Sequence, residues 1–288
     1  MNNIEYKKSI KIITTNNKKL VYKRKNKNKQ ELFNYLKNKN FNNYLEPINV
    51  TDTYEIYKYV DDKTTKEEKE NELINIMSML HIKTTSYQKI DKEKIEKLYN
   101  QIKDKIIYLQ NYYLDLQDYF ESKIIPSPAA QLYLVNASKF HKALRFSLNK
   151  LESWYKEKNN QTIERIVQLH NNLSLEHLLK EDKYYLISWE KEIKDYVIYD
   201  FINFYKNEYL NIELYELFEK YQNKYKYTKD EKLLFESLIS IPEKILFNKS
   251  NFENVVDVRR QIDYIEKTNL FLLKNYEKNQ ESNNHKMN

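Results

Sequence analysis

The chain contains no glycine in its 288 residues, whereas average usage near 7% predicts roughly 20. Turns that need a positive φ must therefore use other residues, and phosphate-binding turns built on glycine cannot form. This excludes the P-loop and the G-x-G-x-x-G dinucleotide turn. Cysteine is also absent, which excludes disulfides, thiolate metal sites and cysteine nucleophiles.

The composition indicates a globular chain with a basic surface. Apolar residues make up 41%, charged residues 32%, and the formal net charge is +7. The 27 tyrosines and many Asn, Lys and Ile residues are typical of A/T-rich coding, so part of the positive charge needs no ligand to explain it. The longest apolar run near the N-terminus is Ile12-Ile13, which is too short for a secretory signal, and no run approaches a membrane span. We therefore expect a cytoplasmic protein.

The N-terminal part predicts strands and one helix. Ile10 to Ile13 and Leu20 to Lys23 indicate a strand pair around a polar turn. Gln30 to Asn38 places Leu32, Phe33 and Leu36 on one helical side. The run from Tyr54 to Val60 is rich in tyrosine and β-branched residues, and this is typical of a strand.

The rest of the chain is mostly helical in pattern. Apolar residues at steps of three and four predict a helix ending at His81, another across Ile95 to Phe120, and a long one over Ala129 to Lys156. The second pattern also fits a coiled coil, although a buried bundle helix is the interpretation we favour. Residues 178–189 predict a hairpin. The remaining predicted helices cover residues 198–209, 211–225, 229–247 and 252–276.

Together these elements predict an α+β chain with two lobes. The boundary falls after Asp61-Asp62. Residues 1–62 form a small β-rich N-lobe, residues 63–280 a large helical C-lobe with a central hairpin, and residues 281–288 a disordered tail.

One segment resembles a known family. From His170 the sequence reads HNNLSLEHLLKEDKYYLISWEKEIKDYVIYDFINFY. This is similar to the catalytic segment of the aminoglycoside phosphotransferase/choline kinase group of kinase-like folds, whose pattern is H-G-D-x-x-x-x-N, a hairpin, D-W/F-E and Y-D-L/F. The resemblance implies that Lys23 is the strand lysine that contacts ATP phosphates and that Glu31 is its helix partner. Leu80-His81 resembles the end of the first C-lobe helix.

The reactive positions depart from the family pattern. The catalytic aspartate is replaced by Asn172, which cannot accept a proton near neutral pH. The two metal ligands are replaced by His177 and Ser188, whereas Mg²⁺ prefers hard and preferably anionic oxygens. The glycine beside the base is Asn171. No catalytic set is intact, and we expect no metal site.

The framework of the segment is retained. His170, Trp189, Glu190 and Asp200 match the family pattern, and the resemblance implies structural as much as chemical roles for them. This combination predicts a pseudokinase that acts as a binding or scaffold module with a protein partner. Lys139 to Trp154 resembles the spore-coat-associated branch, which implies spore coat or cell-envelope assembly. Weak, metal-independent ATP binding through Lys23 and Glu31 stays open.

Three alternatives remain. Glu190 and Asp195 could replace the missing carboxylates, giving an active ATP-dependent small-molecule phosphotransferase. The basic run from Lys18 to Lys29 around Tyr22 could bind a polyanion or nucleic acid, although we favour a solvated strand edge. His177 could bind a transition metal, but a single imidazole is a poor ligand set.

Overall fold

The structure, a computed structural model, describes residues 3–7, 10–15, 18–26 and 29–284. These residues divide into two compact units. The first takes in the chain up to Ser86 and the segment Ile166–Phe204, and the second takes in Tyr87–Arg165 and the chain from Tyr205. The lobe boundary predicted after Asp62 stays a prediction, and the first compact unit continues beyond it.

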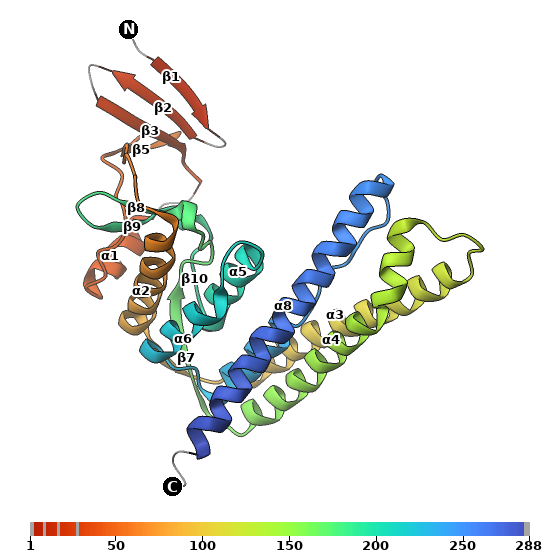
Figure 1. The fold of residues 1–288 in the computed structure, drawn as a ribbon. Coiled ribbons are helices and arrows are strands. Elements are labelled where there is room, and N and C mark those ends of the chain that lie inside the picture. The colour runs from red at the N-terminus through yellow and green to blue at the C-terminus, as the bar shows by residue number, and fades with distance from the viewer. Residues whose placement is uncertain (1–2, 8–9, 16–17, 27–28, 285–288) are drawn as a thin grey trace. The chain divides into compact units, whose positions relative to one another are not determined.

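The first unit is built on an antiparallel sheet of strand order β1-β2-β3-β5-β4 (Figure 1). The strands are β1 (Asn3–Lys7), β2 (Ile10–Thr15), β3 (Lys18–Arg24), β4 (Asn49–Val50) and β5 (Tyr54–Lys58). The predicted strand pair is confirmed, since Ile10 pairs with Lys23 and Ile13 with Leu20. The strand β1 was not predicted, because its alternation is weak.

Two helices accompany this sheet in the same unit. Helix α1 (Gln30–Asn38) has the predicted bounds and buries Leu32, Phe33 and Leu36. Helix α2 (Lys66–Thr84) begins at a capping box, in which Thr65 and Glu68 satisfy each other's backbone N–H groups. Its buried side includes Leu73, Met77 and Leu80.

The segment after residue 166 supplies short elements to the first unit. Strand β7 (Ile163–Leu169), which enters this unit at Ile166, pairs antiparallel with β10 (Ile193–Asp195). Strand β6 (Ser86–Lys89), of which only Ser86 belongs to the first unit, is the third strand of that sheet. The predicted hairpin is confirmed as β8 (Leu178–Lys180) and β9 (Tyr184–Leu186). Short 3₁₀ turns precede and follow the hairpin, and α5 (Ile198–Glu208) begins after it.

The second unit is helical. Its main helices are α3 (Lys92–Glu121), α4 (Pro128–Asn159), α6 (Leu214–Lys224), α7 (Lys229–Ile239) and α8 (Asn251–Asn284). Helix α4 packs against α3, α7 and α8, and Figure 1 shows α3 and α4 running alongside each other. The apolar pattern of α3 therefore belongs to a bundle helix, as favoured above, because Tyr113 on α3 is buried against Tyr133 and Phe140 of α4.

Prolines set two helix boundaries in this unit. Pro128 occupies the first turn of α4, where its missing N–H costs nothing, and the Ser127 side chain caps that turn. Helix α7 ends at Ile239, whereas the pattern predicted a helix to residue 247, so that prediction was wrong. Pro242 explains the earlier end, because proline cannot continue a helix. Helix α8 reaches Asn284, and residues 285–288 of the predicted tail lie outside the described residues.

Candidate functional site

Asp200 anchors the start of the family-like segment. Its carboxylate is fully buried on the first turn of α5. One oxygen accepts the His170 N–H at 3.0 Å, and the other accepts the Asn171 N–H at 2.6 Å. His81, near the end of α2, contacts the same carboxylate through Nε2 at 3.0 Å. Asp200 therefore fixes the backbone where β7 ends and ties it to α2.

His170 is a buried structural side chain. Its Nε2 donates to the Ile187 carbonyl at 2.8 Å, which assigns the Nε2–H tautomer, and Nδ1 has no hydrogen-bond partner among the described residues. Burial lowers the His170 pKa to about 4, so the ring is neutral at neutral pH. The ring packs edge-on against Trp189, with centroids 4.6 Å apart. This arrangement holds the loop and the hairpin end together.

The structure brings together Asn172, His177 and Ser188, the three positions to which the resemblance assigns the base and the metal ligands. His177 Nδ1 donates to the Asn172 carbonyl at 2.6 Å. The Asn172 side-chain amide lies 3.5 Å from the Ser188 carbonyl. The Ser188 hydroxyl accepts a hydrogen bond from Lys23 Nζ at 3.1 Å. Residues from strand β3, the loop after β7 and the hairpin end therefore meet at one place in the first unit.

Two residues of this site, Ser188 and Asn171, have a left-handed backbone. Ser188 has φ 68° and Asn171 has φ 57°, in the region that glycine occupies without strain. Asn171 stands at the glycine position of the family pattern, and its side chain stabilises the turn. Its amide donates to the Lys191 carbonyl at 3.0 Å, and its Oδ1 accepts from Asn203 at 2.7 Å. Asparagine is among the residues that tolerate this conformation best after glycine.

Lys23 is paired with a carboxylate that the resemblance did not assign to it. Glu190 Oε1 lies 2.8 Å from Lys23 Nζ and 3.1 Å from Lys29 Nζ. Lys29 is itself buried and lies 2.7 Å from Glu55. The proposed helix partner of Lys23, Glu31, is instead exposed on the first turn of α1.

The four charges form one alternating cluster, which we call the Lys23 cluster: Glu55, Lys29, Glu190 and Lys23. Burial disfavours the charged form of Glu190, but the two lysines outweigh it and lower the Glu190 pKa to about 2. Two positive and two negative charges cancel, so the cluster is neutral as a whole. Lys29 and Glu55 were missed as site residues. The available signal was one carboxylate within the Tyr- and Ile-rich strand β5, and that signal is weak.

A cavity of about 480 Å³ lies beside the Lys23 cluster. Its walls include apolar side chains from β2, β3, α1 and the hairpin, such as Ile12, Val21, Phe33 and Ile187. Lys23, Lys29 and Ser188 form part of its polar lining. All lining residues belong to the first unit. The cavity suits a largely apolar ligand with a small polar end.

The residues at this place do not fit a magnesium–nucleotide complex. Asn172, His177 and Ser188 offer an amide, an imidazole and a hydroxyl, and none of them is anionic at neutral pH. The nearby carboxylate of Glu190 is held between two lysines. In the described part of the chain, no group of three or more histidine and carboxylate side chains could hold a metal ion. Asp195 uses a carboxylate oxygen to accept the Tyr196 N–H at 2.7 Å.

The basic residues between Lys18 and Lys29 lie in two different environments. Lys23 and Lys29 belong to the Lys23 cluster, while Lys18, Lys19, Arg24 and Lys25 are exposed and Lys27 lies outside the described residues. No helix in the ranges described has the length and apolarity needed to cross a membrane.

An N-terminal antiparallel sheet followed by a largely helical region defines a kinase-like fold. More particularly, the fold is that of aminoglycoside phosphotransferases, and the predicted fold is confirmed. A solved aminoglycoside phosphotransferase from Alicyclobacillus acidocaldarius matches with a TM-score of 0.71 and 13% identity over 96% of this chain and 92% of that one. An AMP-bound spectinomycin phosphotransferase matches with a TM-score of 0.55 and 12% identity over 90% of each chain. At such identities the likeness shows the fold alone. No protein-family model and no curated protein matches the sequence.

Proposed function

We propose that this protein is a catalytically inactive kinase-like protein that acts as a binding module. The observation that carries the proposal is the pairing of Glu190 with Lys23 and Lys29 at 2.8 and 3.1 Å, next to Ser188. Phosphoryl transfer depends on positioned metal ions and on a lysine that contacts the phosphates while it is paired with a helix glutamate. Here the carboxylate on Lys23 is Glu190, which stands two residues after Ser188 and not on helix α1, so two lysines occupy this carboxylate. Asn172, His177 and Ser188 offer only neutral ligands. The same pairing argues against Glu190 as a relocated magnesium ligand.

The cavity next to the Lys23 cluster is where we propose that a small ligand binds. Because the cluster is neutral, a triphosphate without metal would bring several negative charges close to Glu190 without a compensating cation. A ligand of low charge avoids this cost. We therefore expect adenosine to bind more tightly than ATP, and magnesium to have little effect on either. The resemblance of residues 139–154 supports a proposed setting in spore coat or cell-envelope assembly, with a protein as the final partner.

The activity test uses the purified full chain with Mg-ATP and measures ADP formation. We expect no turnover above a protein-free reaction. Turnover that is lost on Glu190→Gln or Asp195→Asn would overturn the proposal, because it would show that relocated carboxylates support catalysis.

The binding test measures the thermal shift caused by adenosine and by ATP, each with magnesium and with a chelator. Val21→Phe adds a ring to the cavity wall and should remove the adenosine shift. Val50→Phe makes the same change at an exposed position of strand β4 and should leave the shift intact. A larger, magnesium-dependent shift with ATP would contradict the proposed ligand class.

A further inference from the structure

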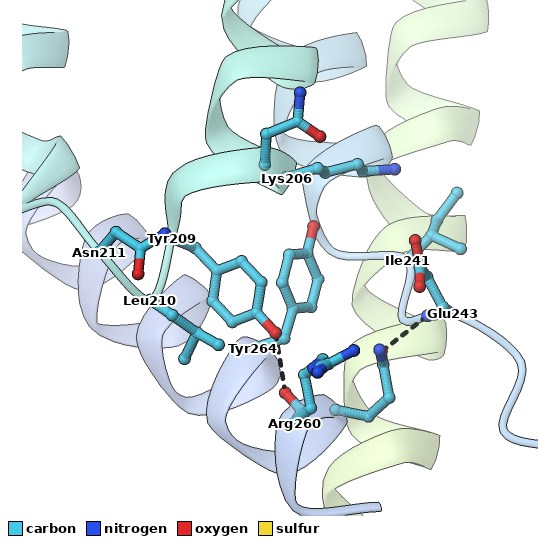
Figure 2. A pocket seen from close by; sticks show the side chains of 10 residues that line it. Lys206, Tyr209, Leu210, Asn211, Ile241, Glu243, Arg260 and Tyr264 are labelled. Carbon is cyan, nitrogen blue, oxygen red and sulfur yellow. Dashed lines mark hydrogen bonds between the residues drawn. The ribbon is translucent and has the colours of Figure 1, made fainter. Parts of the chain in front are cut away.

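A second cavity lies entirely within the second unit. Its volume is about 330 Å³. Figure 2 shows it framed by the end of α5, the segment after α7, and α8. The residues that matter for its chemistry are Lys206, Tyr209, Glu243, Arg260, Gln261 and Tyr264.

Hydrogen bonds hold the aromatic and polar walls in place. The Tyr209 hydroxyl donates to the Arg260 carbonyl at 3.2 Å, and the Tyr264 hydroxyl donates to the Ile239 carbonyl at 2.5 Å. The two rings meet edge to face with centroids 5.0 Å apart. Gln261 Oε1 accepts the Glu243 N–H at 2.8 Å. These contacts therefore hold the walls of the cavity in place.

The charges around the cavity are not balanced. Lys206 is half-buried on α5, and the carboxylate that acts on it, Glu243, does so through its charge and without a hydrogen bond. The exposed Arg260 guanidinium has no ion-pair partner in the described part of the chain. Two cations against the one carboxylate of Glu243 leave an excess of one positive charge. Burial lowers the Lys206 pKa to about 8, and the positive charge of Lys105 on α3 adds to this effect. The negative charge of Glu243 opposes both, but its effect is the smallest of the three. An anion that binds beside Lys206 would therefore stabilise the charged form of its side chain.

We propose that this cavity binds a small organic anion, with its carboxylate or phosphate group on Lys206 and Arg260 and its apolar part against Tyr209 and Tyr264. Charge-assisted hydrogen bonds from an ammonium and a guanidinium are strong and suit both anionic groups. The two tyrosine rings favour a ligand with an aromatic or aliphatic body over a bare ion. The site is separate in sequence and chemistry from the neutral cavity of the first unit, and it goes beyond the proposed function.

Binding at this site should depend on pH in a defined direction. An anion favours the charged form of Lys206, so its pKa rises on binding and a proton is taken up near pH 8. Affinity is greatest below about pH 8 and falls as the pH rises through that value. The charged groups that act on Lys206 are Lys105 of α3 and Glu243. The other charged and titratable groups lining the same cavity are Arg260 and Tyr264 of α8 and Tyr209.

The test is calorimetric titration of the full chain at pH 7 with phenyl phosphate, benzoate and inorganic phosphate. We expect an organic anion to bind more tightly than inorganic phosphate, and the first two probes decide between a phosphate and a carboxylate group. Lys206→Met should weaken binding at least tenfold. Lys97→Met removes the same charge from an exposed position of α3 and should leave binding unchanged. Equal losses in both variants, or no binding of any probe by the wild-type protein at about 10 mM, would overturn the proposal.

A second measurement separates a ligand contact from a structural role. Lys206→Arg keeps the positive charge but moves its titration far above pH 8. It should retain binding and lose the decline around pH 8. In the wild-type protein, acetylation of Lys206, followed by mass spectrometry, should slow when the bound probe is present, whereas acetylation of Lys97 should not. If the probe protects neither lysine, the anion does not occupy this cavity.

Discussion

Lys23 on strand β3 and Glu190 after the hairpin meet at 2.8 Å, although they lie 167 positions apart in the chain. Lys29 approaches the same carboxylate at 3.1 Å. An isolated buried carboxylate is costly, and its cost is recovered only when its partners are close and well oriented. The two lysines and Glu190 therefore tie the N-terminal part of the first unit to the family-like segment.

Replacing Glu190 should destabilise the protein. Glu190→Gln keeps the shape but leaves Lys23 and Lys29 without their shared carboxylate, and we expect a loss of about 2–3 kcal/mol in the free energy of unfolding. Urea denaturation at pH 7 measures it. Glu181→Gln, which breaks the exposed pair with Lys58, should cost less than about 1 kcal/mol. Similar losses in the two variants would show that burial adds nothing to the Glu190 pair.

The pH dependence of that loss has a fixed sign. The folded pKa of Glu190 is about 2, below its ordinary value of 4.5. Its contribution is therefore complete above about pH 4.5 and is lost as the pH falls toward about 2. Wild-type protein and Glu190→Gln should converge in stability over this range. A constant difference down to pH 2 would contradict the ionic origin of the effect.

Asp200 should be more important for the fold than any exposed carboxylate. Asp200→Ala removes the acceptor of two buried backbone N–H groups and the partner of His81, so we expect a loss of about 3–5 kcal/mol. Hydrogen exchange at His170 and Asn171 should accelerate in parallel. Asp182→Asn, in the exposed hairpin turn, is the control and should change neither. Unchanged exchange at His170 would refute the anchoring role.

The sequence predicted the elements more reliably than the site contacts. Helix α1 and the strand pair β2–β3 follow from local apolar spacing, so their bounds were nearly correct. The partner of Lys23 could not be found in the same way, because ion pairing depends on how distant segments meet. The resemblance implied Glu31 as the partner of Lys23, yet Glu31 is exposed, and Glu190 makes the contact.

The ends of helices show where apolar spacing alone fails to predict structure. Apolar spacing continues past Ile239, but Pro242 ends α7 because local backbone chemistry outweighs the pattern. Asn40, which follows the C-cap of α1, has φ 57°, and asparagine is among the residues that tolerate this region best after glycine. Backbone requirements are thus readable from sequence where one residue type decides them.

His170 should remain neutral across the physiological pH range. Burial lowers its folded pKa to about 4 from an ordinary value of 6.5. Between these two pH values His170 is protonated in the unfolded chain but neutral in the folded protein. The free energy of unfolding should therefore fall by about 2–3 kcal/mol as the pH drops from about 6.5 to about 4. NMR of the imidazole nitrogens should show the Nε2–H tautomer at pH 6. A His170 titration midpoint near 6.5 would be incompatible with its burial, and His170→Gln should remove this part of the pH dependence.

The left-handed asparagines provide a test of why glycine can be absent. Asn40 has φ 57°, and the hydrogen bond it accepts from Lys83 uses its backbone carbonyl. Asn40→Gly therefore relieves backbone strain without losing a side-chain contact, and we expect a gain of about 0.5–1 kcal/mol. Asn171 has the same φ, but its side chain bonds the Lys191 carbonyl and Asn203. Asn171→Gly should therefore lose about 1 kcal/mol, because two hydrogen bonds outweigh the relieved strain. Thermal denaturation of both variants measures the two effects. If both variants are stabilised equally, the asparagine side chain at position 171 makes no contribution of its own.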